Sequence, residues 1–365
     1  MKAFLLTLLA FFILLINNLT CKAQKNDLAV IAYYAGKDLT AIDSIEASQL
    51  THIIYSFCHL KGNRLYVDDA RDTAVIQKLV GLKSKNPRLK VMLSLGGWGG
   101  CETCSDVFST DINRKAFAAS VKELNQYFGT DGLDLDWEYP AIEGYPGHAY
   151  KPQDKENFTS LVKALRNTLG KNAIISFAAG GFQKFIDESV EWQKVMEQVD
   201  MVNLMTYDLV NGYSTTTGHH TALYSTTQQV ESTDKAVDRL LRIGIPANKI
   251  VIGAAFYGRV WEKVPATNNG LYQQGVFKTS VGYRDFPMQF SPEDGFVTYW
   301  DEKAQAPYIY NASKNLFITY DNKQSLALKT KYAKDKGLKG IMFWELTHDT
   351  FSNGLLDIID QTKKK

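Results

Sequence analysis

The sequence lacks an excess of charge of either sign. It contains 41 basic and 39 acidic residues. Removal of a leader over residues 1–23 would take away Lys2 and Lys22 and leave 39 of each kind. Nucleic acids and anionic membranes are bound by strongly basic surfaces. The composition therefore argues against both as partners and suits a neutral polymer as the ligand.

Apolar runs of signal-peptide length are confined to the N-terminus. Lys2 precedes an apolar stretch over residues 3–16, and the small residue Ala23 follows a short polar segment. This pattern predicts a secretory signal peptide over residues 1–23, and the apolar run is shorter than a membrane-spanning helix requires. A lipid anchor at Cys21 is the alternative, but the preceding residues fit a lipidation box poorly. We expect a secreted or periplasmic protein.

Cysteine is scarce, with four residues in the chain. Cys101 and Cys104 form a Cys-x-x-Cys pair, but no second pair or histidine cluster at ligand spacing completes a metal site. We therefore expect no metal and no cofactor. In an exported protein the pair favours a local disulfide that tightens the preceding glycine-rich loop. Cys58 lies in an apolar run and is expected to be a buried thiol.

The chain also lacks a linker rich in proline or serine, an internal repeat and a low-complexity segment. Instead, eight apolar runs dense in Val, Ile and Leu alternate with segments of helical spacing, which indicates a parallel sheet covered on both faces. The predicted strands are 28–34, 52–58, 91–96, 132–138, 174–179, 201–207, 250–256 and 340–344, with helices including 113–128, 156–169, 233–242 and 325–336. Eight such units predict an α/β fold, a (β/α)₈ TIM barrel forming one catalytic domain over residues 24–365.

A doubly wound open sheet is the alternative fold. No Gly-x-Gly-x-x-Gly follows the first apolar run, and no phosphate loop is present, so the usual ligands of that fold have no binding motif here. One connection is also unusual, because more than 80 residues separate Phe256 from Gly340. Structureless loops of that length are uncommon. We predict a small α+β insertion subdomain over residues 261–322, between the seventh and eighth strands, forming a wall of a cleft.

Three acidic residues stand at alternate positions of the fourth predicted strand. Asp134, Asp136 and Glu138 occupy every second position, so an extended strand places all three on one face, with neighbours roughly 6–7 Å apart at Cβ. Like charges at this spacing should raise at least one pKa, which suits acid–base catalysis. The alternative is a solvated edge strand. The flanking aromatic residues Trp137 and Tyr139 fit a sugar-binding cleft better.

Other predicted strands also end in groups suited to binding sugars. The active site of a barrel of this kind lies where the strands end. The residues at these ends include Tyr33, Tyr34, Phe57, Ser94, Gly97, Trp98, Met205, Tyr207, Asp208, Tyr257, Arg259 and Trp344. Each alone is compatible with core packing. Six strand ends of this kind on one rim, together with the acidic strand, indicate a binding site.

These motifs resemble those of the family 18 glycoside hydrolases, the chitinases and their relatives. The stretch from Asp131 to Glu138 matches the family's Asp-x-x-Asp-x-Asp-x-Glu signature at all four acids. The segments 94–97, 205–208 and 253–259 are similar to three further motifs, although Ala255 stands where proline is expected, and Trp344 matches the Trp that closes the eighth strand. The resemblance covers about residues 28–357, and the long connection matches the family's chitinase insertion domain.

The resemblance implies a role for each catalytic candidate. Glu138 would be the general acid that later activates water. The nucleophile would be the substrate's own 2-acetamido oxygen, because the family belongs to the substrate-assisted exceptions among glycosidases. Asp136 would hold the acetamido N–H, Asp134 would share a proton with Asp136, and Tyr207 would donate a hydrogen bond to the acetamido oxygen.

Substrate binding would fall to residues around these four. The candidates are Tyr34, Phe57, Gly97, Trp98, Trp137, Tyr139, Met205, Asp208, Tyr257, Arg259 and Trp344. The family often has Trp near the position of Tyr213, so the leaving-group side of the cleft differs here. Asp131 does not share the alternation that places the three acids on one face of the strand, and it is expected to be structural. His219 and His220 are expected to be loop residues and not metal ligands.

The expected function is that of a monomeric secreted chitinase that cleaves β-1,4 bonds between N-acetylglucosamine units of chitin or chito-oligosaccharides. One alternative is a related endo-β-N-acetylglucosaminidase or peptidoglycan hydrolase, against which the aromatic-rich insertion argues. Another is a non-catalytic chitin-binding lectin. Such lectins typically lack the acid at the position of Glu138, which this chain retains.

Overall fold

The computed structural model describes residues 28–365. The predicted signal peptide and the alternative lipid anchor at Cys21 lie outside the described residues. Within the described range, no helix is both long enough and apolar enough to cross a bilayer.

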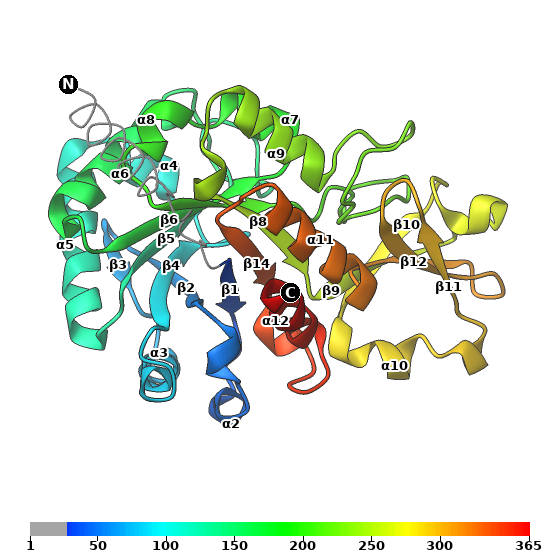
Figure 1. Cartoon of the computed structure of the whole chain (residues 1–365). Helices are drawn as coiled ribbons and strands as arrows, with labels where there is room; N and C mark the ends of the chain where they lie inside the picture. The colour runs from blue at the N-terminus through cyan, green and yellow to red at the C-terminus, as the bar shows by residue number, and fades with distance from the viewer. Residues whose placement is uncertain (1–27) are drawn as a thin grey trace, which may run out of the picture.

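Eight parallel strands close into a barrel (Figure 1). They are β1 (Ala29–Tyr34), β2 (His52–Lys61), β4 (Lys90–Gly96), β5 (Gly132–Asp136), β6 (Ile174–Gly180), β7 (Met201–Met205), β8 (Ile250–Ala255) and β14 (Gly340–Trp344). The sheet order is β1-β14-β8-β7-β6-β5-β4-β2, and pairing of β1 with β2 closes the barrel. A short strand, β3 (Arg64–Tyr66), pairs antiparallel with β2. The predicted (β/α)₈ barrel is confirmed.

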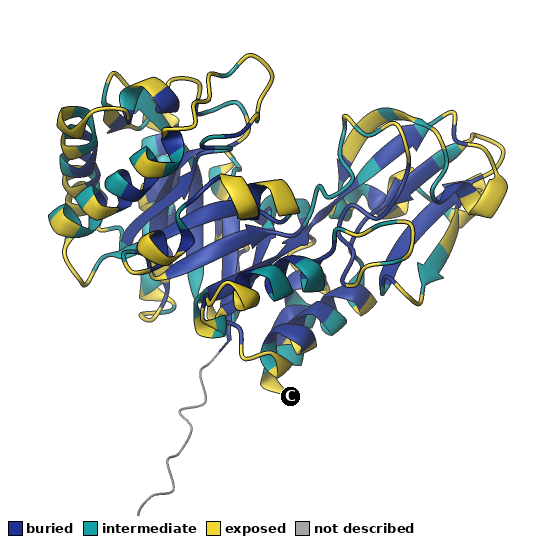
Figure 2. Ribbon diagram, turned by 90° about the horizontal axis from the view of Figure 1, so that it is seen from above, coloured by how far each residue is buried: buried dark blue, intermediate teal, exposed yellow. Residues whose placement is uncertain are grey.

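Helices cover the outside of the barrel, and Figure 2 shows the strands buried beneath them. They are α2 (Leu39–Asp43), α3 (Ala70–Gly81), α4 (Cys104–Val107), α5 (Asp111–Phe128), α6 (Asp154–Leu169), α7 (Gln183–Glu188), α8 (Trp192–Met196), α9 (Thr233–Arg242), α11 (Lys323–Asp335) and α12 (Leu355–Lys364). Local signals set several of their ends. Ser232 caps α9 by accepting from the Lys235 N–H, and Asn322 and Ser325 form a capping box at α11.

Alternation along each strand separates two apolar layers. In β1, Ile31 and Tyr33 belong to the cluster inside the barrel, whereas Val30, Ala32 and Tyr34 belong to the layer beneath the helices. Successive side chains of a strand point to opposite faces. The strands are therefore buried on both sides, which explains why their sequences are dense in Val, Ile and Leu.

A second, antiparallel sheet is inserted between β8 and β14. Its strands are β9 (Tyr257–Glu262), β10 (Val276–Gly282), β11 (Val297–Asp301), β12 (Ala306–Asn311) and β13 (Leu316–Thr319), in the order β10-β9-β13-β12-β11. The short helix α10 (Phe286–Gln289) lies between β10 and β11. The sheet stands to one side of the barrel (Figure 1). Its first strand starts at Tyr257, upstream of the predicted start at residue 261.

Candidate active site

The three alternating acids, Asp134, Asp136 and Glu138, lie together toward the carboxyl end of β5. Asp134 and Asp136 are buried in the strand, and Glu138, partly buried, follows two residues beyond its end. Burial, the charges of Glu138 and Asp134, and a hydrogen bond with Glu138 raise the pKa of Asp136 well above its ordinary value. Burial also raises the pKa of Glu138 to about 7. Both carboxyl groups are thus protonated far more readily than free ones.

Asp134 is surrounded by four hydrogen-bond donors. The donors are Tyr33 Oη at 3.1 Å and Ser94 Oγ at 2.9 Å to Oδ2, and Ser176 Oγ at 2.6 Å and Asn203 Nδ2 at 3.1 Å to Oδ1. Burial raises the pKa of Asp134, and these four bonds act in the opposite direction. Both oxygens of Asp134 are thus taken by other donors, and the hydrogen bond that raises the pKa of Asp136 is the one with Glu138.

Sequence reasoning did not assign roles to Tyr33, Ser176 and Asn203. They lie on β1, β6 and β7, respectively. Of these strands only β6 is next to β5, and there Ser176 is in register with Asp134. The available signal was a polar residue within an otherwise apolar strand, since such a residue needs a partner when buried. In the Tyr33–Tyr34 pair, the tyrosine that contacts the acids is Tyr33.

Two glycines at the end of β4 allow the chain to approach the acids closely. A Cβ atom at Gly96 would lie 2.3 Å from the carbonyl oxygen of Asp136, and one at Gly97 would lie 2.3 Å from the ring of Phe57. The Gly97 N–H donates to the same Asp136 oxygen at 2.9 Å. Phe57 in turn stacks on Trp344, with ring centroids 5.5 Å apart. These contacts bring the predicted residues Phe57, Gly97 and Trp344 together beside β5.

The two cysteine predictions are confirmed. Cys101 and Cys104 form a disulfide directly after the glycine-rich segment that follows β4. Cys58 is a free, buried thiol, and burial raises its pKa. The disulfide therefore closes a tight turn over residues 101–104, directly after the segment that carries Gly97 and Trp98.

Asp208, just beyond the end of β7, pairs with Arg259 on β9. Arg259 donates two hydrogen bonds to the Asp208 carboxylate, from Nε at 2.5 Å and from Nη2 at 2.6 Å. Burial alone would raise the pKa of Asp208, but the bonds from His220 and Arg259 outweigh it and hold that pKa well below its usual range. Asp208 is therefore an anion fixed in orientation.

Tyr207 and Tyr257 line the same region, with ring centroids 6.2 Å apart in an edge-to-face arrangement. Burial and the charge of Asp136 raise the pKa of Tyr207, so its hydroxyl stays protonated. The hydroxyl lies 3.8 Å from Met342 Sδ, a weak acceptor. It can therefore donate to a better acceptor on a ligand. Met205 belongs to the cluster inside the barrel.

Aromatic side chains form a rim above the acids. Trp98 is 46% exposed and Tyr213 is 66% exposed, with ring centroids 6.4 Å apart. Tyr139 lies 6.3 Å from Trp98 and is hydrogen-bonded to Glu138, which lowers the pKa of that acid against the larger effect of burial. Exposed aromatic faces beside the acids are suited to stacking on sugar rings.

Two candidate binding residues face away from this site. Trp137 is buried in the layer beneath the helices and packs against Phe108 and Phe158. Tyr34 is also buried in that layer, and its hydroxyl donates to the carbonyl oxygen of Asp38. The structure does not bring these two predicted binding residues to the acids, because alternation places both side chains on the opposite face of the barrel wall.

Asp131 lies at the start of β5, away from the three acids. Its Oδ2 accepts from the Val91 N–H at 2.8 Å, and its carboxylate pairs with Lys83 and Lys90. The bond to Val91 ties β5 to β4. This agrees with the structural role expected for Asp131.

His219 and His220 lie in the connection between β7 and α9 and are both buried. His219 Nε2 lies 3.1 Å from Asp301 on β11, and His220 Nδ1 lies 3.4 Å from Asp208. Each histidine thus contacts a single carboxylate, Asp301 for His219 and Asp208 for His220. Between residues 28 and 365, no group of three or more His, Cys, Asp or Glu side chains is arranged to hold a metal ion.

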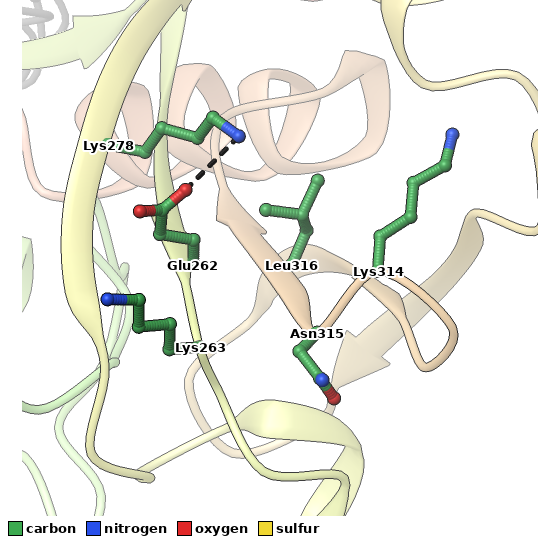
Figure 3. Close-up of a pocket in the computed structure, with 6 residues that line it drawn as sticks. All are labelled: Glu262, Lys263, Lys278, Lys314, Asn315 and Leu316. Atoms are coloured by element: carbon green, nitrogen blue, oxygen red, sulfur yellow. Dashed lines mark ion pairs between the residues drawn. The ribbon is translucent and has the colours of Figure 1, made fainter.

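A pocket of ≈ 330 Å³ lies on the second sheet and contains none of the predicted site residues (Figure 3). It is lined by Glu262, Lys263, Lys278, Lys314, Asn315 and Leu316. Lys278 pairs with Glu262 at 3.2 Å. The pocket has a basic lining without the acid–base groups found at β5, so it does not compete with the barrel mouth as the catalytic site.

Carboxyl groups with raised pKa values at the mouth of a barrel, beneath exposed aromatic rings, define a class of protein: a barrel enzyme that hydrolyses glycosidic bonds. Comparison with known proteins gives the family. The model of the glycosyl hydrolases family 18 matches residues 29–349. The chain belongs to this family, and the suspected resemblance is confirmed.

Several relatives carry the names of characterised activities. Chitinase A1 of Niallia circulans is 35% identical over 298 residues, which are 75% of this chain and 42% of that protein. Chitotriosidase-1 of Mus musculus is 30% identical over 331 residues, 84% of this chain and 68% of that protein. The chain thus spans less than half of the length of Chitinase A1 and about two thirds of chitotriosidase-1.

Solved structures agree with the family. A family 18 N-acetylglucosaminidase from Paenibacillus barengoltzii is similar with a TM-score of 0.83 at 37% identity, covering 92% of this chain and 99% of that one. Chitinase ChiA74 from Bacillus thuringiensis has a TM-score of 0.84 at 28% identity, covering 93% of this chain and 70% of that one.

Proposed function

We propose that the protein is a secreted or periplasmic chitinase, active as a monomer, that hydrolyses β-1,4 bonds between N-acetylglucosamine units by a retaining, substrate-assisted mechanism. The pairing of Asp136 with Glu138 is the observation that carries this proposal. Glu138 has a pKa of about 7, so near neutral pH it holds a proton in a large fraction of molecules and can give it to a leaving oxygen.

The acids around Glu138 argue for a nucleophile supplied by the substrate. Asp134 is fully buried behind the site and bonded to four donors. Asp208 is held by Arg259. Asp136 has a strongly raised pKa, which makes it a poor nucleophile at neutral pH. A 2-acetamido oxygen would form an oxazolinium ion in place of a covalent glycosyl-enzyme.

The neighbouring groups fit the steps of this mechanism. Asp136 is placed to turn from Glu138 toward the acetamido N–H, since Asp136 Oδ1 has no hydrogen-bond partner within residues 28–365. Tyr207 would donate to the acetamido oxygen. Glu138, once deprotonated, would take a proton from the water that opens the oxazolinium ring. Retention follows because the anomeric carbon is inverted twice: the acetamido oxygen attacks the face opposite the leaving group, and water then attacks the face that the leaving group has left.

The substrate class follows from the walls of the site. Phe57 and Trp344 offer stacked apolar faces beside the acids, and Trp98 and Tyr213 offer exposed rings farther out. Several rings in succession suit a chain of sugars. Two relatives that match this chain are named as a chitinase and a chitotriosidase, which supports chitin or chito-oligosaccharides as substrates.

The proposal is tested by incubating residues 24–365 with chitin hexamer and resolving the products by size and anomer over time. Early β-anomeric dimers, trimers or tetramers would support a retaining chitinase. Products that are α-anomeric in the first turnovers would contradict retention, and binding without cleavage would indicate a lectin. A protein that neither binds nor cleaves chitin hexamer would next be tested on N-glycan cores and peptidoglycan.

A second candidate function is release of single N-acetylglucosamine units. It is favoured by the similarity to the family 18 N-acetylglucosaminidase at 37% identity. The same time course separates the two activities, because this candidate predicts monosaccharide as the first product from the hexamer, with pentamer appearing alongside it.

A further inference from the structure

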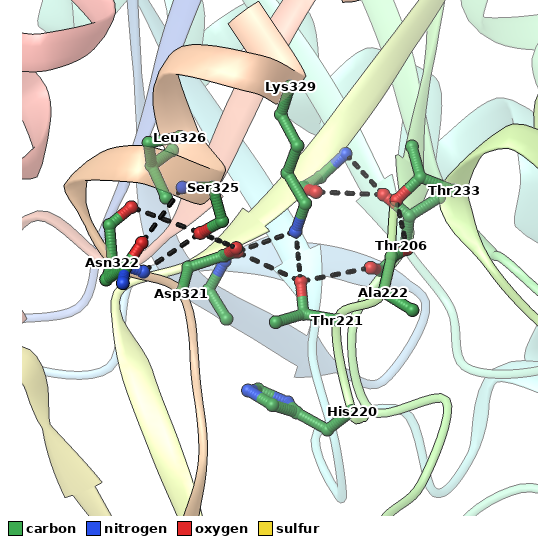
Figure 4. A network of polar contacts seen from close by, with 12 residues as sticks. Thr206, His220, Thr221, Ala222, Thr233, Asp321, Asn322, Ser325, Leu326 and Lys329 are labelled. Atoms are coloured by element: carbon green, nitrogen blue, oxygen red, sulfur yellow. Dashed lines mark hydrogen bonds and ion pairs between the residues drawn. The ribbon is translucent and has the colours of Figure 1, made fainter. Parts of the chain in front are cut away.

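A buried ion pair lies behind the site, between the barrel and α11 (Figure 4). Lys329 and Asp321 are both 0% exposed, and Lys329 Nζ lies 2.7 Å from Asp321 Oδ2. Lys329 also donates to the hydroxyl of Thr221. Replacing such a pair with apolar residues of similar volume is often neutral or stabilising, so stability alone is a weak reason for its presence.

Asp321 connects the ion pair to the end of β8. Its Oδ2 accepts from the N–H of Ala255 at 3.0 Å, and its Oδ1 accepts from the Ser325 hydroxyl at 2.7 Å. Ala255 is the last residue of β8, and Tyr257 begins β9 two residues later. The carboxylate therefore fixes the backbone at the point where the barrel passes into the second sheet.

Thr221 connects the ion pair to the end of β7. Its hydroxyl lies 3.4 Å from the carbonyl oxygen of Thr206, which directly precedes Tyr207, and 3.0 Å from Asp321 Oδ2. Thr221 also directly follows His220, whose Nδ1 lies 3.4 Å from Asp208 Oδ1. The Thr221 hydroxyl thus lies against the backbone that leads to Tyr207, and Thr221 adjoins a residue that contacts Asp208.

We propose that Lys329 is a positioning residue for hydrolysis, which holds Tyr207 and Asp208 in place through Thr221 and Asp321. This inference rests on the substrate contacts proposed above for Tyr207 and Asp208. Lys329 itself does not touch substrate. Its ammonium group orients the Thr221 hydroxyl and the Asp321 carboxylate. Thr221 lies against the backbone that leads to Tyr207 and Asp208, and Asp321 fixes Thr221 and the neighbouring end of β8.

The test compares hydroxyl and ammonium variants in the residue 24–365 protein, with chitin hexamer as substrate. T221V removes the hydroxyl at nearly constant volume, and T221S keeps it. K329M removes the ammonium group, and K331M is the matched control. Lys331 lies on the same helix but is exposed and pairs with Asp335. For each variant, the melting temperature, kcat and KM are measured.

T221V and K329M should lower kcat by about 10–100-fold with little change in KM, because a small displacement of positioning groups has costs of this size. T221S and K331M should stay within about twofold of the unchanged protein. In a D208N background, K329M should lower kcat/KM by much less than it does alone, because residues that act through one another are not additive.

A folded T221V protein with unchanged kcat would overturn the proposal, as would equal losses from K329M with and without D208N. If K329M does not fold, the comparison of T221V with T221S decides, since neither introduces an unpaired buried charge. The two proposals fail separately. If the unchanged protein does not cleave chitin hexamer, the proposed function fails; if it does and T221V matches it, only the positioning role fails.

Discussion

Replacing Glu138 with Gln removes the acidic proton and leaves the volume of the side chain almost unchanged. The amide can still bond to Asp136 and Tyr139, the two groups that are hydrogen-bonded to Glu138, so the fold should be unchanged. It cannot protonate a leaving oxygen. We expect kcat to fall by at least about 10²–10⁴-fold, the usual contribution of a general acid, while binding of chitin hexamer to the aromatic rim persists.

The same substitution should increase stability at neutral and alkaline pH. Burial raises the pKa of Glu138 from 4.5 to about 7, so folding favours the protonated form. The stabilisation from this proton is complete below pH 4.5 and is lost as pH rises through about 7. The rise of the Glu138 pKa from 4.5 to about 7 corresponds to a change of about 3 kcal/mol in the free energy of unfolding. Glu138→Gln carries no charge and avoids this loss.

Both effects can be measured on one preparation. Hydrolysis of chitin hexamer gives kcat, and urea denaturation at pH 4 and pH 8 gives the free energy of unfolding. Glu143→Gln is the matched control, because Glu143 is exposed in the loop that follows Glu138. Near-normal turnover by the Glu138 variant would refute the assignment of the acid. A stability difference between the variant and the unchanged protein that does not grow with pH would refute the raised pKa.

Three further predictions follow from the site. The kcat/KM of the unchanged protein should fall as pH rises above about 7, because Glu138 then loses its proton; a rate profile from pH 4 to 9 checks the direction. Arg259→Met should lower kcat/KM by at least about 10-fold and raise the pKa of Asp208, because a partly buried carboxylate loses its partner; steady-state kinetics and an NMR titration of Asp208 measure the two changes. Trp98→Ala should raise KM without lowering the melting temperature, whereas Trp137→Ala should cost about 3–5 kcal/mol of stability, since only Trp137 is buried in the core; kinetics and urea denaturation on both variants separate the two roles.

The barrel could be predicted because its signals are local. Val-, Ile- and Leu-rich runs mark strands buried on both faces, and the even spacing of Asp134, Asp136 and Glu138 places them on one side of β5. The same alternation, applied strictly, would also have excluded Trp137. An aromatic residue next to a catalytic acid in the sequence was mistaken for one next to it in space.

The surroundings of the acids could not be predicted in the same way. Asp134 takes its hydrogen bonds from β1, β4, β6 and β7, and the partners of Asp208 come from β9 and from the loop before α9. These contacts depend on which strands are neighbours and on their register. A polar residue in an apolar strand shows that a partner exists, but it does not say which one.

The amino-acid sequence by itself determined the strand and helix pattern, the family signature and the three acids, because each depends on spacing along a few residues. Only the tertiary structure decided that Tyr33 and not Tyr34 faces Asp134 and that Lys329 reaches Thr221 across more than a hundred positions of the chain. Closure of the barrel and docking of α11 bring these groups within hydrogen-bonding distance, and the cost of leaving a buried charge unpaired then selects the partner.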